Sequence, residues 1–153
     1  MRHLIIVSYT VSAALLAALS FAASAQTTGV GYVKTVTGDA WVTTAGQQVK
    51  AAPGTTVSVG SQLKTASSAS MGVTFRDNTV MSFGPDTELT VDEYLYAPAQ
   101  GRLQLTANLA RGSLNYVSGV IAKLKPESVQ VKTPTGIIGV RGTQFVVLVE
   151  DAQ

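Results

Sequence analysis

The chain has 153 residues, of which 46% are hydrophobic and 13% are charged, and its formal net charge at pH 7 is +2. A nucleic-acid binder would be expected to carry a basic stripe interleaved with aromatic residues, and this near balance of charge argues against one. The chain has no cysteine, and its one histidine is His3. Beyond the first residues, the composition therefore excludes most zinc sites and the Ser-His and Cys-His nucleophile pairs.

Residues 1–25 have the layout of a secretory signal peptide. The chain starts with the basic residue Arg2, continues with an apolar run from Leu4 to Phe21, and then has the small residues Ala23-Ser24-Ala25. A retained membrane anchor is the alternative, but the polar continuation lacks a charged stop-transfer cluster. We therefore expect cleavage after residue 25, a periplasmic location, and no membrane span in the processed chain.

Residues 26–153 are predicted to form one all-β domain, since apolar and polar residues alternate in several short segments. The positions expected to face the core are Met71, Val73 and Phe75; Leu89 and Val91; Leu103 and Leu105; and Val129 and Val131. Turn-forming Gly, Pro, Asp and Asn residues separate these segments. We expect a compact antiparallel sandwich or rolled β-sheet, with a short β-solenoid-like roll as the alternative. One helical turn is expected before Pro126.

The sequence gives no sign that carboxylates are paired for catalysis, and it offers only a thin set of ligands for a metal. Asp92 and Glu93 are neighbours, and neighbours on a strand point to opposite faces. Asp77, Asn78 and Asp86 offer few oxygen ligands for calcium. We therefore predict no enzyme activity, no catalytic residues, no cofactor and no bound metal.

Three aromatic residues are candidates for a binding surface. Tyr94 and Tyr96 lie two residues apart and share one face of a strand, and Trp41 could add to the same surface. Exposed rings of this kind stack on sugars, whereas rings paired across strands belong to the core. Both interpretations are open at the level of the sequence, and the core is favoured.

The segment 133–147, with the sequence TPTGIIGVRGTQFVV, places an arginine among apolar residues and glycines. Arg141 could offer its planar guanidinium to a ligand carboxylate or phosphate. The favoured interpretation is structural: a partly buried arginine at a sheet corner, paired with Asp77 or Asp39, beside glycines that permit a bulge or a close approach. The predicted structural motif consists of Thr133, Pro134, Gly139, Arg141, Gly142 and Thr143.

Three blocks resemble, in order, the FecR-type periplasmic domain. They are GSQLKT, VTFRDNTVMSFGPDTELTVDEYLY and GSLNYVSGVIAKLKPESVQVKTPTGIIGVRGT, and the resemblance covers roughly residues 31–149. It implies the fold and the periplasmic compartment, and it points to sensing or signalling. Asn78 stands where the resemblance leads us to expect a turn glycine, and asparagine tolerates a positive φ.

These observations predict a non-enzymatic module of the bacterial cell envelope that recognises another protein through a sheet face or edge. The partner is expected to be an envelope protein of unspecified identity. Two alternatives come from other classes of function: a peptidoglycan-binding module that uses Tyr94 and Tyr96, and a structural component that associates with itself through sheet edges.

Overall fold

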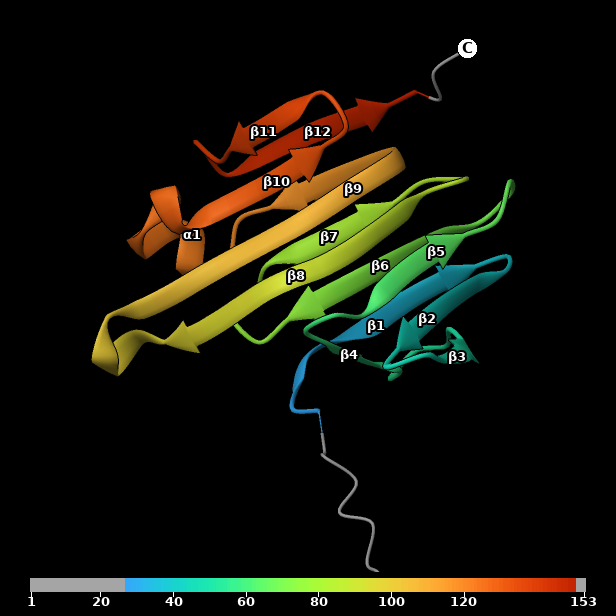
Figure 1. The fold of residues 1–153 in the computed structure, drawn as a ribbon, viewed down its shortest axis with the longest axis horizontal. Helices are drawn as coiled ribbons and strands as arrows, with labels where there is room; N and C mark the ends of the chain where they lie inside the picture. Colours follow the sequence, from blue (N-terminus) through green and yellow to red (C-terminus); the bar gives the residue numbers. More distant parts are fainter. Residues whose placement is uncertain (1–26, 151–153) are drawn as a thin grey trace, which may run out of the picture.

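A computed structural model describes residues 27–150, which form a rolled antiparallel sheet (Figure 1). The predicted signal peptide, residues 1–25, lies outside the described residues. The strands are β1 (Gly29–Thr37), β2 (Ala40–Thr44), β3 (Gln47–Lys50), β4 (Thr56–Ser58), β5 (Gln62–Thr65), β6 (Ser70–Phe75), β7 (Val80–Phe83), β8 (Glu88–Ala97), β9 (Arg102–Val117), β10 (Val129–Thr133), β11 (Gly136–Gly139) and β12 (Gln144–Val149). The short helices are α1 (Val120–Leu124) and the 3-10 turns η1 (Pro98–Gln100) and η2 (Pro126–Ser128). No helix within residues 27–150 is long and apolar enough to cross a membrane.

The strands follow the order β3-β2-β5-β8-β9-β7-β6-β1-β4. Three further strands lie outside this order: β10 and β12 each pair with β9, and β11 pairs with β10. All pairings are antiparallel except that of β10 with β9. The prediction of a rolled antiparallel sheet is confirmed. A solenoid would stack its strands in parallel, so the alternative does not describe this fold.

Strand β9 is shared by the two halves of the roll. Its first part pairs with β8 and β10, and its last part pairs with β7 and β12. Gly112 lies between the two parts with φ +88°, and a Cβ there would lie 2.4 Å from the Cα of Thr87. Only glycine fits this position, because both the backbone conformation and the space exclude a side chain.

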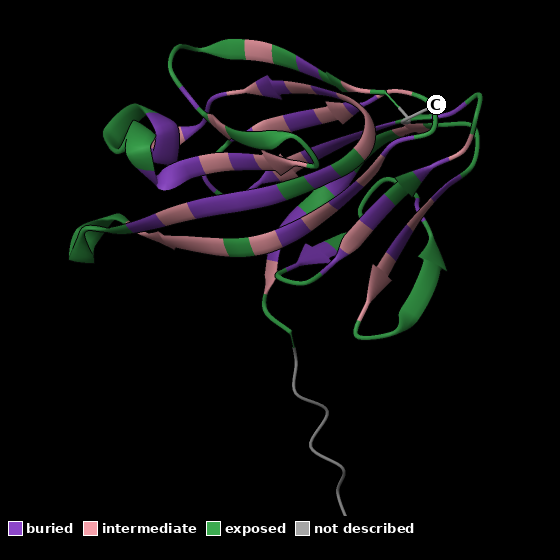
Figure 2. Cartoon of the chain, turned by 45° about the horizontal axis from the view of Figure 1, so that its top comes forward, coloured by how far each residue is buried: buried purple, intermediate pink, exposed green. Residues whose placement is uncertain are grey.

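The core lies between the two halves, as the buried inner faces of the strands in Figure 2 show. The predicted inward positions are all buried: Met71, Val73, Phe75, Leu89, Val91, Leu103, Leu105, Val129 and Val131. Period-two alternation therefore identified the inner face correctly, because burial of one face selects apolar residues at every second position.

The buried carboxylate of Asp77 holds the β6–β7 turn, β8 and α1 together. It accepts hydrogen bonds from the Thr79 hydroxyl (2.7 Å), the Thr79 N–H (3.3 Å), the Tyr94 hydroxyl (3.1 Å) and the Ile121 N–H (3.1 Å). The Asp77 carbonyl also accepts from the N–H of Val120 (2.7 Å). This network fixes the start of α1, and therefore the path of the chain into β10.

Candidate functional site: a groove between two strand edges

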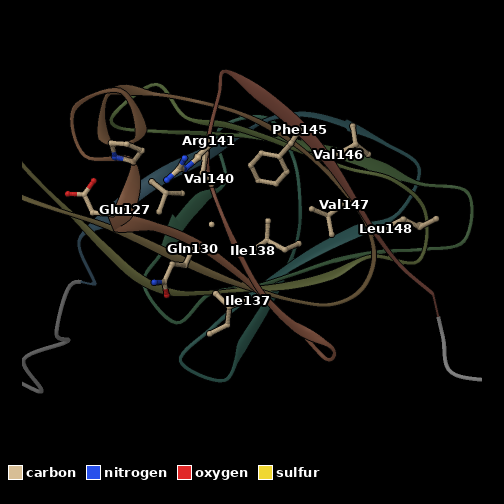
Figure 3. A pocket seen from close by; sticks show the side chains of 13 residues that line it. Glu127, Gln130, Ile137, Ile138, Val140, Arg141, Phe145, Val146, Val147 and Leu148 are labelled. Atoms are coloured by element: carbon tan, nitrogen blue, oxygen red, sulfur yellow. The ribbon is translucent and has the colours of Figure 1, made fainter.

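A mainly apolar groove of about 860 Å³, whose lining also includes Glu127, Gln130 and Arg141, lies between β11 and β12. Figure 3 shows Ile138, Phe145 and Val147 pointing into it, whereas Val146 and Leu148 point to the other side of β12. A second hollow of about 480 Å³ continues toward Thr135 and Glu150 and shares several of the same lining residues. The two hollows together follow β11 and β12 along their whole length.

The walls of the groove are two strands that follow each other in the chain without pairing. Within residues 27–150, β11 pairs only with β10 and β12 only with β9. The loop 140–143 joins them at one end. It is held by Ser118, the residue directly after β9, which donates from its N–H to the Thr143 carbonyl (2.8 Å) and from its hydroxyl to the Gly142 carbonyl (2.8 Å). Each wall therefore presents an unpaired strand edge to the groove.

The alternation of hydrogen bonds shows which backbone groups of β12 face the groove. The N–H of Ser118 donates to the chain that leads into β12. The carbonyl of Ser113 points in the opposite direction, toward β7, and accepts a hydrogen bond from the N–H of Gly84 (3.3 Å). Bonded and non-bonded pairs alternate along an antiparallel ladder. In the observed register, Phe145 and Val147 bond to β9. The N–H and C=O groups of Gln144, Val146 and Leu148 are consequently directed to the free edge.

This edge lacks the features that protect sheet edges in monomeric proteins. Natural edge strands are commonly short or carry charged residues. At the other end of the roll, β4 has three residues, and β3 is exposed throughout and includes Lys50. In contrast, β12 has six residues without a charge, and Val146 and Leu148 are 70% and 65% exposed. The structure thus leaves the apolar edge of β12 open.

The predicted motif at 133–143 forms parts of both walls. Thr133 ends β10 and Pro134 begins the turn to β11, across which the Thr133 hydroxyl donates to the Gly136 carbonyl (3.0 Å). Gly139 ends β11, and Gly142 has φ +105°. Thr143 leads into β12. A Cβ built at Gly139 or Gly142 would meet no atom within 4 Å, so neither glycine is required by a close approach.

The prediction that Arg141 is partly buried and paired with Asp77 or Asp39 is wrong. Arg141 is exposed at the closed end of the groove, and it forms no ion pair within the described residues. Both predicted partners are engaged elsewhere: the Asp77 carboxylate binds Thr79, Tyr94 and Ile121, and Asp39 pairs with Lys50 at 2.8 Å. Buried backbone and hydroxyl donors satisfy Asp77, so the fold needs no buried arginine there.

The three candidate aromatic residues do not form one platform. Tyr94 stacks on Phe75 with 5.6 Å between ring centroids, and its hydroxyl is bonded to Asp77. Tyr96 is half-buried and packs against the core. Trp41 is aligned through β5 with Glu88, roughly 20 Å along β8 from Tyr94 at the usual rise per residue. Sugar binding by these residues stays a prediction.

The residues that line the groove were not among the candidate site residues predicted from the sequence. Ile137, Ile138 and Phe145–Val149 were seen only as a strand-like region beside the arginine. The signal that could have identified them is the continuous apolar run FVVLV, since a strand with one solvated face normally alternates. Within residues 27–150 no group of three or more His, Cys, Asp or Glu side chains is placed to hold a metal ion.

Tyr116, which is buried, and Tyr94, which is half-buried, make the stability of the domain sensitive to alkaline pH. Burial raises the pKa of Tyr116 to about 12 from 10.0. Burial, and next the nearby Asp77 carboxylate, raises the pKa of Tyr94 above its ordinary value. The folded state holds these protons more tightly than the unfolded chain. The stabilisation is therefore complete below pH 10.0 and is lost as the pH rises toward about 12.

We expect the melting temperature of the protein to fall steeply above about pH 10, and Tyr116→Phe to reduce that dependence because phenylalanine does not ionise. Thermal unfolding of both proteins, followed by circular dichroism across this range, measures the difference. Identical pH profiles for the two proteins would contradict the role of Tyr116.

Taken together, the fold and the groove define an all-β domain with an open strand edge. Residues 61–153 match the family described as FecR protein, and the chain belongs to this family. The FecR family is a non-enzymatic signalling family whose domains are associated with the cell envelope. No curated protein and no solved structure matches the chain.

Proposed function

We propose that this FecR domain is a periplasmic protein-recognition module that binds an extended segment of an envelope protein in the β11–β12 groove. The observation that carries the proposal is the pair of unpaired strand edges that flank an apolar groove. Strand addition uses main-chain hydrogen bonds for affinity and pockets for alternate side chains for specificity. The groove offers both.

The lining of the groove defines the chemistry of the bound segment. The inward side chains that contact Ile138, Phe145 and Val147 should be apolar, because these three residues carry no polar side-chain atoms. Its outward side chains would lie beside the exposed Val146 and Leu148, and apolar or β-branched residues pair well across strands there. The segment is therefore a mainly apolar strand, and binding removes the exposed apolar edge from water.

Periplasmic location is supported by the predicted signal peptide at 1–25 and by the association of the family with the envelope. Recognition of an envelope protein follows from that location and from the absence of the charge pattern that nucleic-acid binding requires. The proposed role in sensing is coupled to the same groove, because occupancy of the groove is the signal that a partner is present.

Site-specific photo-cross-linking in cells tests the proposal. A photo-reactive residue in place of Ile137 or Leu148, which are 65% exposed beside the groove, should cross-link to an apolar segment of an envelope protein. The same residue in place of Val49, exposed on β3, is the matched control. Cross-links of equal yield from Val49, or cross-links to the chain itself and to nothing else, would overturn the proposal.

Binding of the identified partner should then depend on the groove. Ile138→Lys places a charge where the bound strand must be buried, and we expect the affinity to fall at least about tenfold. Val49→Lys adds the same charge at the far edge and should leave the affinity unchanged. Calorimetry with the purified partner compares the two variants.

A further inference from the structure

We infer that, without the envelope partner, two copies of this chain pair antiparallel through their β12 edges to form a symmetric dimer. The β12 edge directs the backbone groups of Gln144, Val146 and Leu148 outward from β9, as the alternation of hydrogen bonds shows. A strand that pairs there needs apolar side chains on both of its faces. The run Phe145–Val149 of a second copy meets this requirement.

One register matches like with like along the whole strand. When the two-fold axis passes through Val147, Val146 of one copy lies opposite Leu148 of the other, and Phe145 lies opposite Val149. Gln144 then lies opposite Glu150, so that the polar ends also meet. A register centred on Val146 would instead place Gln144 opposite Leu148, a polar residue against an apolar one.

The charges at the two ends of β12 favour the antiparallel direction. Arg141 precedes the strand and Glu150 follows it, and both side chains are exposed and form no ion pair within the described residues. Antiparallel pairing brings the basic end of each copy toward the acidic end of the other. Parallel pairing would place Arg141 beside Arg141 and Glu150 beside Glu150, which is repulsive.

The edges at the far end of the roll do not favour growth beyond two copies. The edge strand β4 is short, and β3 carries the exposed Lys50 and two exposed glutamines. These edges are protected in the way that prevents continued edge-to-edge growth. Pairing through β12 alone is isologous, because each copy uses the same surface, and such contacts form closed dimers.

The dimer goes beyond the proposed function, because it assigns a second occupant to the same edge. A strand that occupies the free edge of β12 excludes another strand from that edge. Dimer formation would therefore shield the apolar edge, and an envelope partner would have to displace the second copy. This competition rests on the proposed function, whereas the dimer itself does not.

Cysteine cross-linking of the purified, processed protein tests the register directly, because the natural chain contains no cysteine. In the inferred pairing, the two Val147 residues form a non-hydrogen-bonded pair with Cα atoms about 4.5 Å apart, within the range that a disulfide spans. Val147→Cys should give a disulfide-linked dimer under mild oxidation. Val49→Cys, on the exposed edge of β3, should not.

Two further measurements test the dimer even if Val147→Cys folds poorly. Light scattering of the unmodified protein should give twice the monomer mass, and Val146→Lys should give the monomer mass with an unchanged circular dichroism spectrum, since position 146 is exposed in the single chain. A monomeric unmodified protein overturns the dimer. Cross-linking through Val146→Cys in place of Val147→Cys overturns the register. A dimer that forms without any envelope cross-link refutes only the proposed function.

Discussion

Replacing Asp77 with alanine is expected to lower the free energy of unfolding by about 3–5 kcal/mol. The carboxylate is fully buried and accepts hydrogen bonds from Thr79, Tyr94 and the N–H of Ile121. Its removal leaves these donors buried without an acceptor, and it frees the start of α1. Equilibrium denaturation in urea measures the change in the unfolding free energy.

Asp39→Ala is the matched control for this substitution. Asp39 also forms a close contact, at 2.8 Å from Lys50, but both side chains are more than half exposed. Exposed ion pairs contribute less than about 1 kcal/mol. If Asp39→Ala and Asp77→Ala destabilised the protein equally, the network around Asp77 would not have the importance that its burial indicates.

Gly112→Ala is expected to lower the free energy of unfolding by about 2–5 kcal/mol, the sum of a left-handed backbone cost and an overpacking cost. Gly112 has φ +88°, and the new Cβ would lie 2.3 Å from the hydroxyl oxygen and 2.4 Å from the Cα of Thr87. The backbone of β9 would have to move at the point where the strand passes between the two halves of the roll. Urea denaturation again gives the measurement.

Gly60→Ala separates the two contributions. Gly60 has a similar φ of +84°, but a Cβ there would have no neighbour within 4 Å. We expect it to cost only the backbone term, about 1–2 kcal/mol. A loss at Gly112 no larger than the loss at Gly60 would show that the strand relaxes around the added methyl group.

The inner face of the roll could be predicted from the sequence because burial acts on every second residue of a strand. Met71, Val73 and Phe75 are an example, and all three are buried. Two local features of the backbone could also be predicted from the sequence. Asn78 adopts φ +65°, as expected of a residue in place of a turn glycine, and the short helix ends before Pro126.

The groove could not be predicted, because it depends on which strands fail to pair. Residues 136–139 and 144–149 read as two consecutive strands with a short connection, which is the usual pattern of a hairpin. Instead β11 pairs with β10 and β12 with β9, and no local feature of the sequence encodes that choice. The exposure of Arg141 follows from it, since the arginine lies in the loop between the two walls.

The role of β9 has a consequence for how the domain folds. Its partners come from residues on both sides of it in the chain, from β7 and β8 before it and from β10 and β12 after it. Contacts between distant residues dominate such a topology, and the entropy of closing long loops slows their formation. The sheet therefore stays incomplete until the last strand is available, and we expect neither half of the roll to fold as an independent unit.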